Sequence, residues 1–528
     1  MKKNLLVCTL CALILACGTP KENSSTISEK KHPEDPTIYA NTITSEELKE
    51  MLYTYASDEF EGRETGEPGQ KLAVNYLKEQ YMALGTPSPF SNDNYFQEVP
   101  LERQRIADAQ VKVNGKSAIA FDDFIPSSYV NVPAFSVNQI VYVGYGIDSE
   151  NYSDYKDIDV KGKIVVFKSG EPMNADSTYV TSGTKEKTKW TSGRNARKLK
   201  IDTAKKLGAK GIFVLDNRAH TYYSKVYKRL DESGYKGTIS SARDDENEAF
   251  YFLINQSFAS TLVKDISTNH KPRVIDTNLE IAIKKNYENI SSENVVAYIE
   301  GAEKPNEVLV ISAHLDHEGV KDGNVYNGAD DDGSGTVALL EIAEAFKTAM
   351  KDGIKPKRSI LFLHVTGEEK GLLGSKYYTD KDPIFPLENT VANLNIDMIG
   401  RVSPKRKGDR NYVYVIGSDK LSSDLHQLSE AVNAKYTNID LDYTYNDDND
   451  PNRYYYRSDH YNFAKNNIPV IFYFNGTHDD YHKPTDTADK IQYDLLENRT
   501  RLVFYTAWEV ANRDKRVIVD KVETTTAP

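Results

Sequence analysis

One segment of the chain places an apolar run directly before polar side chains: Val308-Leu309-Val310-Ile311-Ser312-Ala313-His314-Leu315-Asp316-His317. The run Val308–Ile311 is typical of a strand that is buried on both faces of a parallel sheet. His314 follows three residues later and offers an imidazole, a common zinc ligand. The segment therefore predicts a central strand that ends in a candidate metal ligand.

Three further apolar runs, Ser359–Leu363, Val391–Ile396 and Pro469–Phe474, alternate with helical patterns such as Gly335–Met350. This alternation favours an α/β fold with a mainly parallel central sheet covered by helices on both faces. The carboxyl ends of parallel strands meet at one rim, where such sheets bind ligands. Candidate ligands follow all four runs, and we expect them to meet there: His314, Glu368, Glu369, Asp397 and His482.

The acidic run Asp330-Asp331-Asp332 stands just before the predicted helix at Gly335. One acid, Asp332, is enough to cap that helix, whereas three adjacent carboxylates repel one another unless a cation compensates. We therefore predict that Asp331 bridges two metal ions and that Asp332 supports it from outside the ligand set.

The pair Glu368-Glu369 follows the second run, and adjacent acids at a strand end project in different directions. We predict that Glu369 binds metal and that Glu368 is the general base, which moves a proton from water to the leaving amine. Asp397 ends the third run, where a carboxylate is costly unless it is paired or bound to metal.

The histidines divide into ligands and neighbours. We expect the carboxylate of Asp316 to accept the second ring N–H of His314 and so to fix its tautomer. His317 is assigned no metal and is either an outer partner or exposed. Tyr481, beside His482, is predicted to donate its O–H to an oxyanion, and His460 and His478 are interpreted as structural or supporting residues.

Length and charge limit the classes of function. A chain of 528 residues is too long for one compact core, so we expect two domains or one domain with an insert. The net charge of −12 argues against nucleic acid and anionic membrane surfaces as partners, because both attract clustered Lys and Arg.

The N-terminus predicts export. Lys2 and Lys3 precede an apolar run, Leu5–Ala16, which is too short to span a bilayer. Ala16-Cys17 resembles the lipoprotein cleavage site, which implies a signal peptide over residues 1–16, a lipid on Cys17 and a flexible tether over residues 17–38. An ordinary cleaved signal peptide is the alternative. We expect the body of the protein to be in the periplasm or at the cell surface, membrane-anchored only through Cys17.

Residues 115–276 differ in character from the rest. Strand-like runs at Gly162–Phe167 and Ile212–Leu215 flank a helical pattern at Lys198–Leu207. This layout resembles the protease-associated domain, a small α/β module that often interrupts exopeptidases. An unrelated α/β insert is the alternative.

The polar segments together resemble the bacterial co-catalytic dizinc aminopeptidases, relatives of leucyl aminopeptidase, glutamate carboxypeptidase, glutaminyl cyclase and the transferrin receptor. The similarity covers roughly residues 40–112 and 277–518. It implies a zinc-exopeptidase fold with three α/β/α layers, of the phosphorylase/hydrolase-like type, formed by residues 39–114 and 277–518.

The resemblance also implies a ligand set and a cofactor of two Zn²⁺ ions, for which Mn²⁺ or Co²⁺ could substitute. Its counterparts here are His314 and Asp397 for one ion, Glu369 and His482 for the other, Asp331 between them, Glu368 as base and Tyr481 at the oxyanion. The family also has a cis peptide after its bridging aspartate, which corresponds to Asp331-Asp332.

These features predict a metallo-aminopeptidase that removes N-terminal residues from peptide substrates. Acids near the metals, with the loop Asp447–Asp450, would hold the substrate ammonium. A carboxypeptidase or dipeptidase of the same family is the alternative, for which Arg401, Arg453 and Arg457 are available. A non-catalytic, lipid-anchored binding protein is less favoured, because structural zinc sites are usually Cys-rich and the three cysteines all lie between residues 8 and 17.

Overall fold

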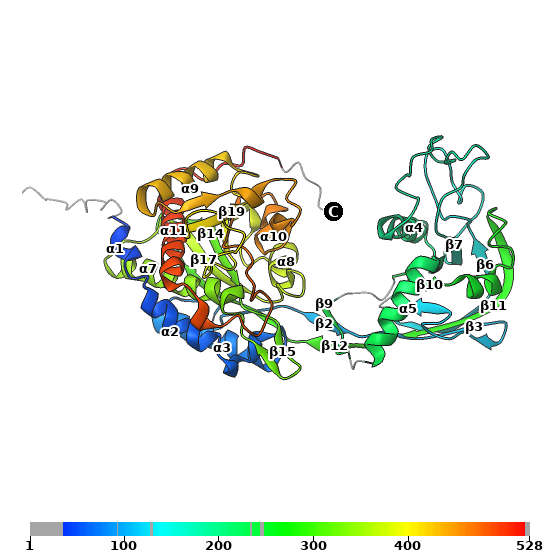
Figure 1. Ribbon diagram of the computed structural model, residues 1–528, viewed down its shortest axis with the longest axis horizontal. Helices are drawn as coiled ribbons and strands as arrows, with labels where there is room; N and C mark the ends of the chain where they lie inside the picture. Colours follow the sequence, from blue (N-terminus) through cyan, green and yellow to red (C-terminus); the bar gives the residue numbers. More distant parts are fainter. Residues whose placement is uncertain (1–34, 92, 127–129, 233–234, 243–247, 523–528) are drawn as a thin grey trace, which may run out of the picture.

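The protein has two lobes that are connected by extended strands (Figure 1). The computed structural model describes residues 35–91, 93–126, 130–232, 235–242 and 248–522. The predicted signal peptide, Cys17 and most of the predicted tether lie outside these residues. The first helix among the described residues is α1 (Thr37–Ala40). It begins inside the predicted tether, which was expected to extend to residue 38. No helix among the described residues is both long and apolar enough to cross a membrane.

The larger lobe is built on an eight-stranded sheet with the order β1-β13-β17-β14-β18-β21-β19-β20. The four central strands are parallel, and the antiparallel pairs lie toward the edges. The strands are β1 (Phe96–Glu98), β13 (Glu293–Ile299), β17 (Arg358–Val365), β14 (Lys304–His314), β18 (Thr390–Ile396), β21 (Val470–Phe474), β19 (Tyr412–Ile416) and β20 (Asp440–Asp442). The predicted mainly parallel sheet is confirmed.

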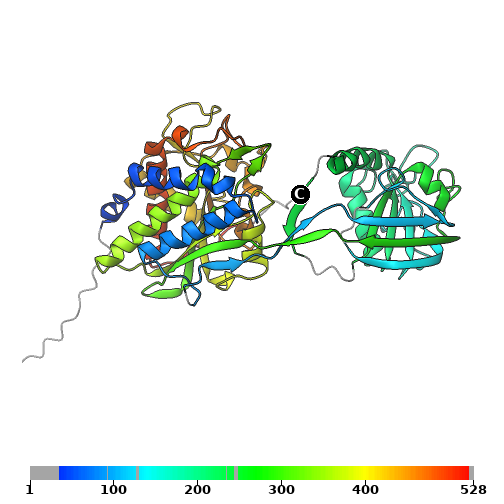
Figure 2. The same cartoon turned by 90° about the horizontal axis from the view of Figure 1, so that it is seen from below.

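Helices cover both faces of this sheet because its strands alternate their apolar side chains between two cores. Leu309 and Ile311 of β14 face one core, and Val308 and Val310 face the other. The first core is covered by α2 (Ser45–Tyr55), α3 (Pro68–Leu84), α7 (Gly335–Lys351), α9 (Ser423–Tyr436) and α11 (Tyr493–Asn512), and the second by α8 (Leu373–Asp380) and α10 (His460–Ala464). Figure 2 shows the blue helices α2 and α3 beside α7 on the first face. The fold is therefore a three-layer α/β/α arrangement.

Strand register brings the predicted ligand segments to one rim. The last residue of β14, His314, pairs with Val365 at the end of β17, and Ile396 at the end of β18 pairs with Tyr473 of β21. Because these strands are parallel, the loops that follow them leave the sheet on the same side.

The smaller lobe contains a second eight-stranded sheet with the order β4-β3-β11-β6-β7-β8-β10-β5. Its strands are β3 (Asp108–Val113), β4 (Lys116–Ser117), β5 (Phe124–Pro126), β6 (Val132–Tyr142), β7 (Ile164–Lys168), β8 (Gly211–Leu215), β10 (Phe250–Ile254) and β11 (Arg273–Lys284), with helices α4 (Arg194–Lys206), α5 (Asn217–Glu232) and α6 (Gln256–Leu262). β3 pairs with β11, so the sheet extends to residues 108 and 284, beyond the predicted limits of 115 and 276.

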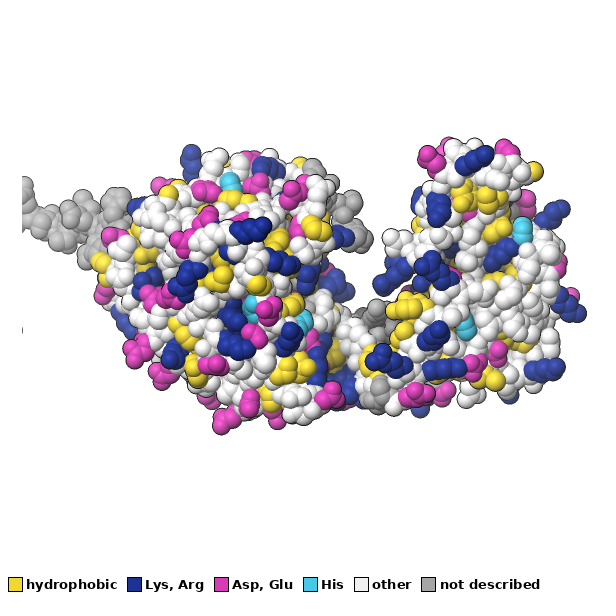
Figure 3. Space-filling view, viewed as in Figure 1, with side chains coloured by type: hydrophobic (Ala, Val, Ile, Leu, Met, Phe, Trp, Pro, Cys, Tyr) yellow, Lys and Arg dark blue, Asp and Glu magenta, His cyan; other side chains and the backbone are white. Residues whose placement is uncertain are grey.

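Acidic and basic side chains are interspersed over the visible face of both lobes (Figure 3).

A small apolar joint fixes the connection between the lobes. The three-stranded sheet β12-β2-β9 consists of β12 (Tyr287–Ile290), β2 (Leu101–Gln104) and β9 (Thr238–Ser241). Leu101, Ile239 and Ile290 of this sheet form one buried cluster with Leu373, the first residue of α8. The insert is therefore packed against the chain just after the pair Glu368-Glu369. A separate hairpin, β15 (Gly319–Lys321) and β16 (Asn324–Tyr326), follows the rim loop of β14.

One buried acid in the first core makes stability depend on pH. Glu341 of α7 is almost fully buried and accepts a hydrogen bond from the backbone N–H of Thr44, 3.3 Å away. Burial, with the nearby carboxylates of Glu47 and Glu344, raises the pKa of Glu341 from 4.5 to about 8. Between these values the native protein holds a proton that the unfolded chain has released, so the free energy of unfolding falls as pH rises.

We therefore expect Glu341→Gln, which keeps an acceptor for Thr44 but has no proton to lose, to stabilise the protein at pH 8 by on the order of 1–3 kcal/mol, with little gain at pH 5. Urea unfolding at the two pH values measures the difference. Glu79→Gln, on the exposed side of α3, is the matched control. An equal gain at both pH values would show that titration of Glu341 is not the cause.

Candidate metal centre

The structure brings the five predicted metal-binding residues together at the rim. His314 ends β14, Asp397 directly follows β18, and Glu369 lies in the loop after β17. His482 comes from the loop after β21, and Asp331 from the turn before α7. Segments that are far apart in the sequence thus meet because parallel strands release their loops on one side of the sheet.

Asp331 lies between two groups of side chains. Its Oδ1 is 3.2 Å from Nε2 of His314, and its Oδ2 is 3.1 Å from Nε2 of His482. Asp397 Oδ1 is 3.7 Å from the same His314 nitrogen, and Glu369 Oε2 is 3.2 Å from the same His482 nitrogen. The two oxygens of one carboxylate therefore face two different imidazoles, each of which has a second acid beside it.

His317 belongs to this cluster, although the sequence analysis assigned it no metal. Its ring is fully buried, with Nδ1 3.0 Å from Glu369 Oε1 and 3.8 Å from Asp331 Oδ2. The interpretation as an exposed residue is wrong. The only sequence signal was its place three residues after His314, which does not separate an outward from an inward side chain in a loop.

Several atoms of the cluster are buried without a hydrogen-bond partner. They are His314 Nε2, both ring nitrogens of His317, Asp331 Oδ2 and Glu369 Oε1. A buried polar atom without a partner is costly, and several such atoms at one point are typical of a site that binds a cation. Imidazole nitrogens and carboxylate oxygens without sulfur suit Zn²⁺, Mn²⁺ or Co²⁺. The residues present therefore fit divalent cations.

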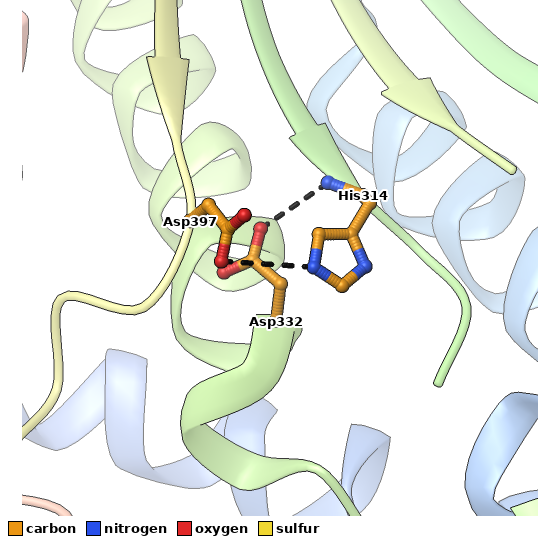
Figure 4. Close-up of side chains that lie close together, drawn as sticks. All are labelled: His314, Asp332 and Asp397. Atoms are coloured by element: carbon orange, nitrogen blue, oxygen red, sulfur yellow. Dashed lines mark hydrogen bonds and ion pairs between the residues drawn. The ribbon is translucent and has the colours of Figure 1, made fainter. Parts of the chain in front are cut away.

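Asp332 ties three segments of the rim together. Its Oδ2 accepts the backbone N–H of His314 at 3.2 Å, and its Oδ1 accepts those of Gly335 at 2.9 Å and Met398 at 3.0 Å. Figure 4 shows its carboxylate between His314 and Asp397. Asp332 therefore lies in the supporting position that was predicted for it, and it also accepts the N–H of Gly335, the first residue of α7. The peptide bond between Asp331 and Asp332 is cis, as the resemblance implied.

The predicted contact of Asp316 requires a correction. Nδ1 of His314 lies 3.0 Å from the backbone carbonyl oxygen of Asp316, whereas the Asp316 carboxylate is 3.9 Å away. That carboxylate instead accepts the hydroxyl of Thr65 at 2.7 Å and the backbone N–H of Glu368 at 3.1 Å. The tight turn after β14 thus aims its carbonyl at the ring, and the Asp316 side chain holds the Glu368 backbone.

Glu368 and Tyr481 lie beside the cluster with perturbed pKa values. Burial and the nearby carboxylates of Glu369 and Asp397 raise the pKa of Glu368 well above its ordinary value. The ring of Tyr481 stacks on His482, with centroids 3.9 Å apart. Burial and the same acidic surroundings raise the pKa of Tyr481, so its O–H remains available as a donor.

An outer ring of buried residues holds the cluster, and the sequence analysis missed most of it. Arg63, which no sequence pattern singled out, is fully buried on the ring of Tyr55. Its guanidinium donates to the carbonyls of Leu315, Asn327 and Gly328 in the two rim loops. No local pattern marks a single Arg for burial, because its partners are backbone carbonyls some 250 residues away.

Other supporting contacts come from buried hydroxyl, acid and imidazole groups. Ser458 donates to Asp397 Oδ2 at 2.6 Å. Asp486 accepts the backbone N–H groups of Asp330 and Asp331 at 3.0 and 3.2 Å. His478 lies 3.1 Å from Asp330 Oδ2, and His460 stacks on Phe472. Both histidines are placed as the sequence analysis expected, outside the cluster.

A hollow of about 320 Å³ lies beside Glu369. One wall comes from the rim and the other from the connecting strands of the insert, Tyr235–Ile239 and Arg103. The rim side includes Glu64 and Lys370, which form an ion pair at 3.2 Å. The insert therefore contributes to the surface next to the cluster.

Comparison with known proteins gives a consistent result. The model of peptidase family M28 matches residues 294–507. The probable leucine aminopeptidase 2 of Aspergillus oryzae is 26% identical over 459 residues, which are 85% of this chain and 75% of that protein. Aminopeptidase YwaD of Bacillus subtilis is 26% identical over 322 residues, 58% of this chain and 64% of that protein.

Among solved structures, an aminopeptidase from Aneurinibacillus sp. strain AM-1 is 18% identical, with a TM-score of 0.47, and the match covers 92% of this chain and 98% of that one. The family match and the aminopeptidase relatives support the prediction that this chain is an enzyme, a metallo-aminopeptidase of the hydrolase class.

Binding of a cation to the cluster should release a proton from the imidazole of His482. Burial lowers the pKa of His482, but the adjacent Asp331 and Glu369 outweigh it and raise the pKa to about 10. A metal ligand must be neutral imidazole, so at any pH below about 10 a cation displaces this proton. Affinity for Zn²⁺ should therefore fall about tenfold for each unit by which the pH is lowered.

Calorimetric titration of the metal-free protein with Zn²⁺, in buffers of different ionisation enthalpy, measures the protons released; we expect about one or more per chain. His482→Gln should release fewer, and His426→Gln, which changes a histidine on α9 outside the cluster, should behave as the wild type. Identical heats in all buffers would contradict this exchange.

Proposed function

We propose that the chain is an exported zinc-dependent exopeptidase, an aminopeptidase that hydrolyses N-terminal residues from peptides at a centre of two Zn²⁺ ions. The position of Asp331 carries this proposal, because its two oxygens face two imidazoles, each with its own acid. His314 and Asp397 would hold one ion, Glu369 and His482 the other, and Asp331 both. Mn²⁺ or Co²⁺ are possible substitutes.

Two ions in this centre would supply the Lewis acidity that acidifies a water molecule and polarises the scissile carbonyl. The protein residues then move the proton and stabilise charge. The carboxylate of Glu368 takes a proton from the attacking water and delivers it to the leaving nitrogen. The O–H of Tyr481 donates to the carbonyl oxygen as negative charge develops there.

Acids near the centre favour recognition of a free amino terminus. Glu318 Oε1 lies 3.5 Å from Nδ1 of His482, and Glu368 is half-buried beside Glu369. A carboxypeptidase or dipeptidase is the second candidate, because Arg457 Nη2 lies 3.5 Å from the hydroxyl of Tyr481. Arg401 is less suited to that role, since it is paired with Asp480 at 2.9 Å.

We further propose that residues 115–276 belong to a protease-associated domain and that export attaches a lipid to Cys17. The parallel strands and flanking helices of the smaller lobe support the first proposal. The Lys-rich start, the apolar run to Ala16 and the following Cys support the second. The membrane would then be contacted only through this lipid.

A pair of dipeptides separates the two peptidase candidates. We expect the zinc-loaded enzyme to cleave a dipeptide with a free amino group and to leave its N-acetylated form intact, because the acids at the rim bind the ammonium. Release of free amino acids measures both reactions. Cleavage of only the blocked dipeptide, with a loss of affinity in Arg457→Gln, would favour a carboxypeptidase instead.

Substitution of the proposed base tests the mechanism. Glu368→Gln should lower kcat by about 10²–10⁴ while the metal content and the KM stay close to those of the wild type, because only the proton carrier is removed. Glu369→Gln is the matched contrast and should lose bound metal as well as activity. Full turnover by Glu368→Gln with two bound ions would eliminate Glu368 as the base.

A further inference from the structure

His317 is held in a slot that leaves its ring no solvent contact. Its backbone N–H donates to the carbonyl of Arg63 at 3.3 Å, and its side chain is 0% exposed. The ring lies on Gly328, where a Cβ would come within 2.5 and 2.6 Å of Cγ and Cδ2 of the imidazole. Gly328 also has a φ of +54°, a conformation that favours glycine. The ring can therefore lie here only because this position carries no side chain.

The buried ring finds no hydrogen-bond partner at either nitrogen. A buried imidazole usually donates one N–H and accepts at the other nitrogen. Here Nδ1 points to two carboxylate oxygens that also lack hydrogen-bond partners, Glu369 Oε1 at 3.0 Å and Asp331 Oδ2 at 3.8 Å. Three potential metal-binding atoms from three segments, one ring nitrogen and two carboxylate oxygens, thus lie close together without a hydrogen-bond partner.

One divalent cation would satisfy all three atoms. Ligand atoms at zinc bond lengths of about 2.0–2.2 Å in a tetrahedron lie roughly 3.3–3.6 Å from one another. The two separations at His317 fall on either side of that range, and the three residues form one of the groups in the structure that could hold an ion. A simple hydrogen bond from His317 Nδ1 to Glu369 would satisfy two of these atoms and leave Asp331 Oδ2 unsatisfied.

We propose that His317 binds the second ion of the centre through Nδ1, together with Asp331, Glu369 and His482. This inference rests on the two-ion function proposed above. The second ion then has two imidazole ligands, whereas the first has one, His314. The two imidazoles also differ in setting, because the side chain of His482 is 34% exposed on a loop and His317 is enclosed. His317 is thus the buried imidazole of this ion.

Metal titration of variants tests the assignment. The metal-free wild type, His317→Gln, His482→Gln and the control His426→Gln, which lies on α9 outside the cluster, are titrated with Zn²⁺ against a chromophoric chelator. We expect two ions in the wild type and in the control. His317→Gln should keep the first ion and weaken the second by about tenfold or more. Near-UV circular dichroism shows whether each variant is folded.

X-ray absorption of the zinc-loaded wild type needs no variant and so remains decisive if His317→Gln does not fold. Three imidazoles shared by two ions are expected, against two without His317. An unchanged second affinity in folded His317→Gln, or only two imidazoles in the wild type, would overturn the assignment while leaving the two-ion function standing. Fewer than two ions bound by the wild type would overturn the proposed function and this inference with it.

Discussion

The rest of the catalytic lobe depends on one electrostatic constraint, which is that many carboxylates are buried at a single rim. Like charges at this distance destabilise one another unless backbone donors or cations compensate. The outer acids, Asp316, Asp332 and Asp486, each accept at least one backbone N–H from a neighbouring segment. The inner acids Asp331 and Glu369 have imidazoles beside them and oxygens without hydrogen-bond partners. Both oxygens of Asp316 and of Asp332 are thereby satisfied by donors of the protein, and the inner set is left for cations.

Much of this arrangement could be predicted from the sequence, because the rule that places it is local. A buried parallel strand is a continuous apolar run, and the residue after it lies at the carboxyl edge of the sheet. His314 and Asp397 each end or directly follow such a run, so their meeting required only the topology. Asp331 could be selected because three adjacent acids exceed what helix capping needs.

The errors concern contacts that sequence spacing does not determine. Whether the carbonyl or the carboxylate of Asp316 faces His314 depends on the turn after β14. The burial of His317 depends on Gly328, which lies eleven residues further along the chain and has no side chain to signal the contact. The extent of the insert depends on pairing between β3 and β11, whose partners are about 170 residues apart. Each of these features arises from tertiary packing.

The joint between the lobes has a consequence for how this chain can vary among its relatives. Leu373 lies four residues after Glu369, and the cluster that covers it includes Leu101, Ile239 and Ile290 of the connecting strands. A relative without residues 115–276 would lose Ile239 from this cluster and so expose part of Leu373 beside the loop that carries Glu369. Loss of the insert in evolution would therefore have required a substitute cover or a polar replacement at this position, so the insert and the loop are expected to change together.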